Sequence, residues 1–168
     1  MCYHLSVKAS LAYVKIIRQL QKNAVRKSLK HKEVYMEIQL WREILNPYDL
    51  AVKELTVKFE HLIQEHRQQG LYSPIEQVDG RVKTISSILD KAQKKNIPIN
   101  EIEEKLVDIA GIRIICQFVE DIQKVVEIIR SRTDMKVIEE KDYVSNMKNS
   151  GYRSYHMIVE YTVETMNG

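Results

Sequence analysis

One segment limits the fold of this chain more than any other, the run IAGIRIICQF at residues 109–118. It is rich in β-branched residues and almost continuously apolar, which is typical of a strand covered on both faces. Such a strand needs other elements packed against it, so the run predicts a sheet with helical cover. Arg113 is the one charge inside the run, and an unpaired buried guanidinium is very costly. This arginine is therefore a candidate functional residue.

The segments around this strand predict an α+β fold. Apolar residues recur at steps of three and four from about Trp41 to Gln68, which indicates a long amphipathic helix. Shorter helices and strands follow it, and their order favours a mixed β-sheet flanked by helices. The other expected elements are an extended segment over 75–83, helices over 84–95, 101–106 (capped by Asn100) and 121–130, and strands over 135–143 and 155–163.

The composition limits which classes of protein this chain can belong to. A chain of 168 residues that is 44% hydrophobic suits one domain with a substantial core. Cys2 and Cys116 form no C-x-x-C pair and have no metal-ligand spacing with the histidines, so neither a disulfide framework nor a zinc site is suggested. No apolar run approaches the ~18–20 residues that a membrane span needs. We expect a soluble protein of the cytoplasm with no membrane partner.

Residues 1–35 differ in charge from the rest of the chain. They hold eight Lys or Arg against one acid, whereas residues 36–168 hold 18 basic and 22 acidic residues. This leader can form a basic helix over residues 1–30 and would then suit a membrane surface or RNA. We favour another hypothesis, that natural translation starts at Met36 and the leader is not native. Residues 32–34, Lys-Glu-Val, can be encoded by a purine-rich ribosome-binding sequence at a workable spacing before this methionine.

Three polar clusters lie at the expected boundaries between elements, where side chains can project without disturbing a core. The first contains Arg81, Lys83, Ser87 and Lys91. The strand period of two puts the first pair on one face, and the helical i, i+4 rule does the same for the second pair. These groups converge near a helix start, which favours phosphate. The alternative is an ordinary solvated basic face.

The second cluster is DIAGIR, residues 108–113, at the start of the central strand. Asp108 stands beside small residues that leave room for a hydrated Mg²⁺, which prefers one or two carboxylates plus phosphate oxygens. Arg113 can pair with phosphate or lie flat on a base. By itself, Asp108 also suits an ordinary loop acid or helix cap.

The third cluster is KNSGYRSYH, residues 148–156. Its glycine permits close approach of the backbone. Tyr152 and Tyr155 offer flat faces for a base, and Lys148, Arg153 and His156 offer cations for phosphate. The alternative is that Tyr155 and His156 simply begin a packed strand.

Taken in order, GRVKTISSILDK, DIAGIRIICQF and KNSGYRSYH resemble the synthetase domain of the small, single-domain alarmone synthetases of the RelA/SpoT family. The resemblance covers about Trp41 to Gly168. It implies a nucleotidyltransferase-like fold and a GTP pyrophosphokinase that transfers the β,γ-pyrophosphate of ATP to the ribose 3′-hydroxyl of GTP or GDP. The product, (p)ppGpp, serves the stringent response. The resemblance also implies a homo-oligomer, a tetramer in the family. Single-stranded RNA is a candidate partner on the rival hypothesis of a binding module, which Tyr152 and the basic clusters would serve equally well.

The resemblance assigns roles residue by residue. Asp108 matches the Mg²⁺ aspartate. Arg113 matches the arginine that stacks on adenine, and Tyr152 matches the tyrosine that stacks on the acceptor guanine. The other ATP contacts match Arg81, Lys83, Ser87 and Lys91, and the other acceptor-site positions match Lys148, Ser150 and His156.

Two departures from the family bear on activity. Lys141 stands where the family usually has Arg, which keeps the charge but loses the bidentate fork. The family continues with a strand E-I-Q-I-R-T, whose glutamate is the second Mg²⁺ ligand, whereas this chain stops at Gly168. We expect impaired catalysis and an open apolar sheet edge. The rival hypotheses are a module that binds nucleotide or RNA without chemistry, and a fragment of a frameshifted gene.

Overall fold

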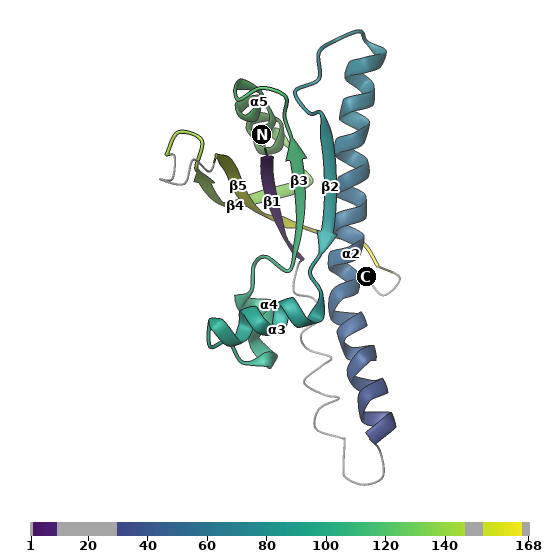
Figure 1. Ribbon diagram of the computed structural model, residues 1–168. Coiled ribbons are helices and arrows are strands. Elements are labelled where there is room, and N and C mark those ends of the chain that lie inside the picture. Colours follow the sequence, from purple (N-terminus) through teal and green to yellow (C-terminus); the bar gives the residue numbers. More distant parts are fainter. Residues whose placement is uncertain (1, 10–29, 147–152, 166–168) are drawn as a thin grey trace.

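The computed structural model describes residues 2–9, 30–146 and 153–165; for residues 2–9 and 30–38 it describes the backbone alone. Its centre is a five-stranded sheet with the strand order β2-β3-β1-β5-β4 (Figure 1). Strands β1 and β5 are parallel and the other neighbours are antiparallel, so the predicted mixed sheet is confirmed. The strands are β1 (Cys2–Ala9), β2 (Gln77–Val82), β3 (Ala110–Ile115), β4 (Met135–Asp142) and β5 (Ser154–Tyr161).

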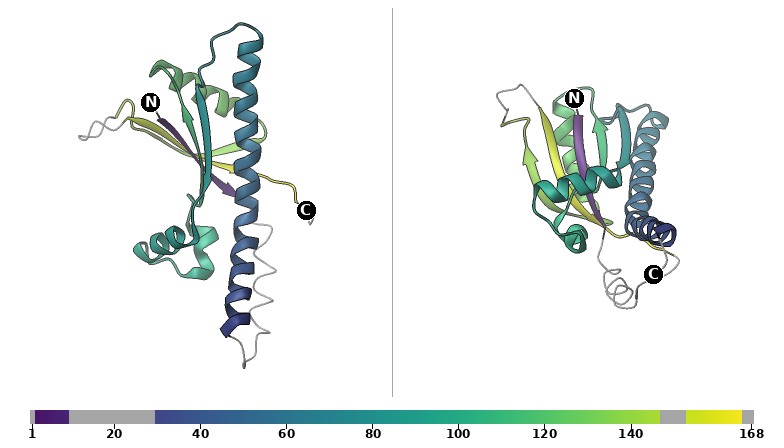
Figure 2. Two further views of the ribbon diagram at one scale, coloured as in Figure 1. Left: turned by 45° about the vertical axis from the view of Figure 1, so that its right-hand side comes forward. Right: turned by 60° about the horizontal axis from the view of Figure 1, so that its bottom comes forward.

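Helix α2 (Lys30–Gln68) runs along the β2 side of the sheet (Figure 2). It includes the helix predicted from Trp41 and begins earlier, because residues 30–40 contain good helix formers even though they lack a clear apolar stripe. Its core face carries Leu55 and Phe59, both fully buried. The helix approaches β2 so closely that a Cβ added at Gly80 would meet the Val52 side chain at 2.5 Å. Glycine at this position therefore sets the distance between helix and sheet.

Shorter helices complete the fold. Helices α3 (Ile85–Lys94) and α4 (Ile102–Lys105) lie beyond one end of β2 and β3, and α5 (Glu120–Ser131) packs beside β4 (Figures 1 and 2). The capping role predicted for Asn100 is wrong. A 3₁₀ turn, η1 (Ile99–Glu101), includes this residue, and no side chain caps it. Pro98 fixes the backbone just before the turn, which starts the helical segment earlier than expected.

The sheet has one buried face and one open face. On β3, Ile112 and Ile114 are fully buried in the core, while Arg113 between them is exposed. The apolar run predicted a strand covered on both faces, and this prediction is wrong at Arg113. Because the guanidinium is exposed, it bears no burial cost. Half-buried His156 lies between buried Tyr155 and Met157 on β5 in the same way, and exposed Arg81 shares its side of β2 with exposed Gln77 and Asp79.

Strand β1 is the largest difference from the sequence prediction. The sequence allowed a basic helix over residues 1–30, whereas Cys2–Ala9 form a strand in the centre of the sheet. The physical reason is a strand pattern within the basic segment, because Tyr3, Leu5 and Val7 alternate with more polar residues. The hypothesis of a start at Met36 stays a prediction, although α2 runs through that position. Within the described part of the chain, no helix has the length and apolar character that crossing a membrane requires.

Candidate active site

Three residues of the first two sequence clusters meet at one point, and we call them the Asp108 cluster. The Lys83 ammonium donates to Asp108 Oδ2 at 2.6 Å, and the Lys91 ammonium makes a short contact with the same oxygen. The Asp108 side chain is 25% exposed, and the lysines are 22% and 34% exposed. The sequence predicted that Lys83 and Lys91 converge, and the structure adds Asp108 as their shared partner.

Local structure explains the convergence. Lys83 follows β2 directly, and its backbone N–H donates to the Ile109 carbonyl at 2.9 Å, which extends the β2–β3 ladder to the residue after Asp108. Thr84 then caps α3 by accepting from the Ser87 N–H at 3.3 Å. Lys91 lies nearly two turns into that helix, and its side chain reaches Asp108 just before the start of β3. The predicted site residue Ser87 is exposed beside the cap, with its hydroxyl 2.9 Å from the Thr84 hydroxyl.

The electrostatics of the Asp108 cluster are unusual. Burial raises the pKa of the Asp108 carboxyl, but the hydrogen bonds and charges of Lys83 and Lys91 outweigh burial and hold the pKa below its ordinary value. Burial lowers the pKa of the Lys83 ammonium, and its contact with Asp108 only partly restores it. Lys91 adds like-charge repulsion to Lys83. An additional anion beside Lys83 would therefore favour its charged form.

One oxygen of this cluster has no hydrogen-bond partner. Among the described residues, Asp108 Oδ1 is a buried side-chain oxygen without a hydrogen bond, which is a costly arrangement. Mg²⁺ takes one or two carboxylates together with phosphate oxygens. Within the described ranges no group of three or more His, Cys, Asp or Glu residues is placed to hold a metal ion. The Asp108 oxygen without a partner is a donor of the type that Mg²⁺ prefers.

The open face of the sheet carries other predicted site residues. Arg113 on β3 and His156 on β5 both lie in the exposed alternation of this face. The His156 ring meets Tyr143 edge-on, with ring centroids 5.3 Å apart. Arg81 pairs in register with Gly111, two residues before Arg113 on β3, so Arg81 and Arg113 lie on the same face. The structure thus brings Arg81, Arg113 and His156 to one face, adjoining the end where the Asp108 cluster lies. Lys148, Ser150 and Tyr152 lie outside the described residues.

A hollow of about 990 Å³ lies beside Lys83. Its wall includes Trp41, Pro47 and Leu50 from α2 and Ile85 at the start of α3. These α2 residues were not predicted site residues, because apolar side chains at helical spacing indicate core packing. Only the three-dimensional proximity of α2 to the β2–α3 junction reveals this wall.

Comparison with known proteins supplies an independent view. The model of the region found in RelA and SpoT proteins matches residues 80–167. GTP pyrophosphokinase YjbM of Bacillus subtilis is 47% identical over 133 residues, which are 79% of this chain and 63% of that protein.

Solved structures agree with this comparison. A GTP pyrophosphokinase family protein from Streptococcus pneumoniae superposes with a TM-score of 0.74 at 49% identity, over 76% of this chain and 63% of that one. Small alarmone synthetase 1 of Bacillus subtilis, solved with its product pppGpp, gives a TM-score of 0.73 at 48% identity, over 77% and 68%. The chain thus spans somewhat under two thirds of the length of the curated relative YjbM.

Proposed function

The chain belongs to the family that carries the RelA/SpoT region, and on that premise we propose that it is a GTP pyrophosphokinase. It transfers the β,γ-pyrophosphate of ATP to the ribose 3′-hydroxyl of GTP or GDP. The bond between the α,β-bridging oxygen and the β-phosphorus breaks, and a bond from the 3′-oxygen to that phosphorus forms. AMP leaves with the bridging oxygen, and the 3′-hydroxyl loses its proton.

The Asp108 cluster is the observation that carries this proposal. Its two ammonium groups share a single carboxylate oxygen while the other oxygen lacks a partner. When a triphosphate enters, its oxygens would accept hydrogen bonds from Lys83 and Lys91. Asp108 would then be available to hold an Mg²⁺, which would neutralise phosphate charge. The site thus holds its cations in place before the substrate arrives, which limits reorganisation during the reaction.

We propose roles for the other predicted residues as well. Arg113 on the open face stacks on adenine, because a planar guanidinium packs well on an aromatic ring. Arg81 and Ser87 contact the ATP phosphates from either side of the β2–α3 junction. The acceptor guanine nucleotide binds Lys148, Ser150, Tyr152 and His156. In-line positioning of two nucleotides and charge neutralisation are most of what such a transfer requires.

The direct test is product formation. Purified chain is incubated with γ-labelled ATP, Mg²⁺ and GTP or GDP, and the nucleotides are resolved by chromatography. Asp108→Ala is the test variant, and Asp90→Ala, an exposed acid on α3, is the matched control. We expect labelled (p)ppGpp and AMP from the parent chain and from Asp90→Ala, and almost none from Asp108→Ala.

Two results would change the assignment. Tight nucleotide binding without product would favour a module that binds nucleotide or RNA without catalysis. Product formation that survives Asp108→Ala would remove this cluster from the site. The homo-oligomer, the single-stranded RNA partner and the cytoplasmic location stay predictions from the sequence.

A further inference from the structure

The outer strand β2 presents a line of polar side chains to the open face of the sheet. A Cβ added at Gly80 would meet the Val52 side chain of α2 at 2.5 Å, so this position faces the helix. The alternate positions Gln77, Asp79 and Arg81 therefore point to the opposite side, and all three residues are exposed. Arg81 already has a role in the proposed function, whereas Gln77 and Asp79 have none.

Asp79 lies across from Arg113, the residue that stacks on adenine in the proposed function. The two are register partners on β2 and β3, and the Cβ atoms of such partners lie about 5 Å apart. Opposite charges at that spacing can form an ion pair, but none joins these two described residues. Instead, the Gln77 amide Nε2 donates to both oxygens of Asp79, at 3.2 Å to Oδ1 and 3.0 Å to Oδ2. Gln77 thus orients the carboxylate beside the guanidinium.

The Gln77–Asp79 pair offers a hydrogen-bond donor and an acceptor side by side. The amide nitrogen of Gln77 carries two N–H groups, so one can hold Asp79 while the other donates to a ligand. The donor nitrogen and the acceptor oxygen Oδ2 are 3.0 Å apart. Adenine has the complementary pattern on its edge, an amino donor at position 6 beside a ring nitrogen that accepts. Guanine has a carbonyl oxygen at position 6, which a carboxylate repels.

The order of residues along β2 matches the order of groups in ATP. Asp79, Arg81 and Lys83 occupy every second position, and each residue of a strand advances about 3.3 Å, so Asp79 and Lys83 are separated by about 13 Å. The Asp108 cluster, which binds the phosphates in the proposed function, includes Lys83. A nucleotide with its phosphates at this cluster and its base on Arg113 brings the edge of the base toward Asp79.

We propose that Gln77 and Asp79 recognise the edge of the adenine that stacks on Arg113, and that they select ATP over GTP as the pyrophosphate donor. Asp79 accepts from the 6-amino group, and Gln77 orients Asp79 and donates to the neighbouring ring nitrogen. The inference rests on the proposed function and adds a determinant of specificity to it. The region that matches the family model begins at Gly80, one residue after Asp79, so that match gives neither residue a role.

The test measures affinity by isothermal titration calorimetry in the presence of Mg²⁺. One ligand is the non-reacting analogue α,β-methylene ATP, and the other is the same analogue of purine riboside triphosphate, which lacks only the 6-amino group. The test variant is Asp79→Ala and the matched control is Glu76→Ala. Glu76 is also an exposed acid with the same charge, but it stands just before β2 in the other alternation of the strand.

The expected result is a loss that depends on the amino group. Loss of one hydrogen bond to a charged group corresponds to a loss of affinity of about tenfold. The parent chain should therefore bind the ATP analogue about tenfold more tightly than the purine riboside analogue. Asp79→Ala should lose about tenfold for the ATP analogue and less than about twofold for the other. Glu76→Ala should change both affinities by less than about twofold.

The other outcomes separate the two proposals. Equal affinities in Asp79→Ala and Glu76→Ala, or an equal loss for both ligands in Asp79→Ala, would overturn the recognition of adenine and leave the proposed function standing. A parent chain that binds both ligands equally well would do the same, and that comparison requires no variant to fold. A parent chain that binds neither ligand would overturn the proposed function together with this inference.

Discussion

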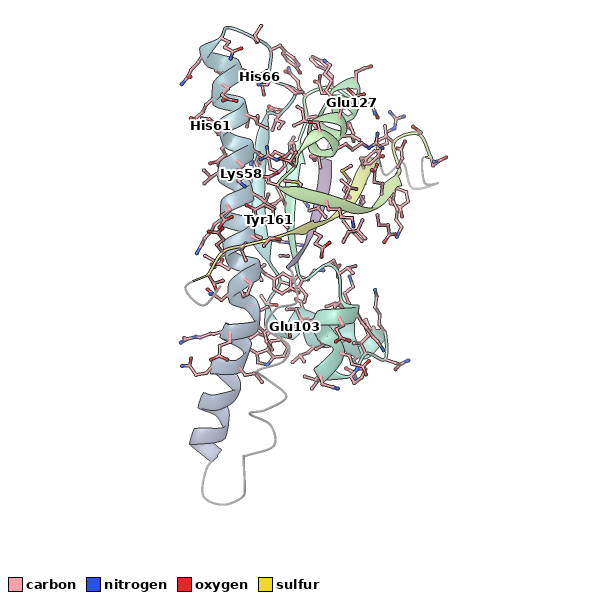
Figure 3. The ribbon with its side chains drawn as sticks, turned by 180° about the vertical axis from the view of Figure 1, so that it is seen from behind. Lys58, His61, His66, Glu103, Glu127 and Tyr161 are labelled. Atoms are coloured by element: carbon pink, nitrogen blue, oxygen red, sulfur yellow. The ribbon has the colours of Figure 1, made fainter. Side chains whose placement is uncertain are left out.

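Two lysine–aspartate clusters in this molecule use the same side chains in opposite ways. The Asp108 cluster lies just before the start of β3. The second, the Asp134 cluster, joins α2 to the α5–β4 turn and to β5, where Lys58 and Tyr161 lie side by side (Figure 3). In it, Lys58 donates to Asp134 Oδ2 and to the Tyr161 hydroxyl, both at 2.7 Å. Arg132 holds both oxygens of Asp134, and Tyr161 donates to Glu54 at 2.6 Å.

The clusters differ in whether their polar groups are satisfied. Both oxygens of Asp134 accept hydrogen bonds, whereas Asp108 Oδ1 accepts none within the described part of the chain. Burial alone would lower the pKa of Lys58, but its hydrogen bonds raise it, whereas the pKa of Lys83 is lowered. A network in which every polar group has a hydrogen-bond partner stabilises the fold. An oxygen without a partner can still bind a ligand. The difference predicts that the Asp108 cluster serves activity and the Asp134 cluster serves stability.

The largest expected effect is the loss of activity in Asp108→Asn. The substitution keeps the shape of the side chain but removes the charge that attracts Mg²⁺. We expect kcat/KM to fall by about 10²–10³-fold, as when one preorganised electrostatic group is removed. The free energy of unfolding should change by no more than about 1 kcal/mol, because both lysines reach solvent. Steady-state kinetics and urea unfolding measure the two quantities.

The Mg²⁺ requirement sharpens this prediction. If Asp108 binds the metal, Asp108→Asn should need more Mg²⁺ for half-maximal activity. An unchanged Mg²⁺ requirement together with a large loss of stability would mean that Asp108 is a structural partner of the lysines, as Asp134 is of Lys58.

The next effect is weaker ATP binding in Lys83→Met. The methionine keeps much of the apolar stem and removes one phosphate-binding cation. We expect the KM for ATP to rise about 10–100-fold, the equivalent of one hydrogen bond to a charged group. Lys94→Met, at an exposed position in the last turn of α3, is the matched control and should change KM less than about twofold. Equal KM values in the two variants would contradict a phosphate role for Lys83.

The sequence predicted this site only in part, and the reasons are physical. Strand and helix periodicity pair Lys83 with Arg81 and Lys91 with Ser87, and the position of both pairs at one helix start predicts that the two lysines converge. Their common partner Asp108 lies 25 and 17 residues further along the chain. No local period connects residues at that separation, so the family resemblance alone placed Asp108 near them.

The fold shows the same limit. The apolar run at 109–118 identified a central strand, but it did not show that Arg113 faces an open side, because burial depends on which strands pair alongside. Strand β1 was missed because its short alternation stands next to a basic segment with a helical stripe. A strand of eight residues gains its stability from two ladders that join it to distant parts of the chain, and local sequence contains no direct sign of them.

A smaller effect, on stability, is expected from Lys58→Met. The change removes the cation between Asp134 and Tyr161, while Arg132 still holds the carboxylate and Glu54 still accepts from the tyrosine. We expect a loss of about 1–2 kcal/mol in the free energy of unfolding, since the side chain is partly exposed. kcat/KM should stay within about twofold of the parent value. A fall in kcat/KM that matched Lys83→Met would remove the functional difference between the clusters.

The smallest effect is a pH dependence of stability that comes from Asp134. Hydrogen bonds from Arg132 and Lys58 outweigh burial and hold the pKa of Asp134 well below its ordinary value of 3.8. A carboxyl whose pKa is lower in the folded state contributes stability above its unfolded pKa and loses it as pH falls toward the folded pKa. The parent chain should therefore exceed Asp134→Asn in unfolding free energy by about 1 kcal/mol at pH 5–7. This difference should shrink as pH falls below about 4. Urea unfolding of both proteins across this range measures it, and a difference that stayed constant with pH would show that the ionised carboxylate contributes nothing to the fold.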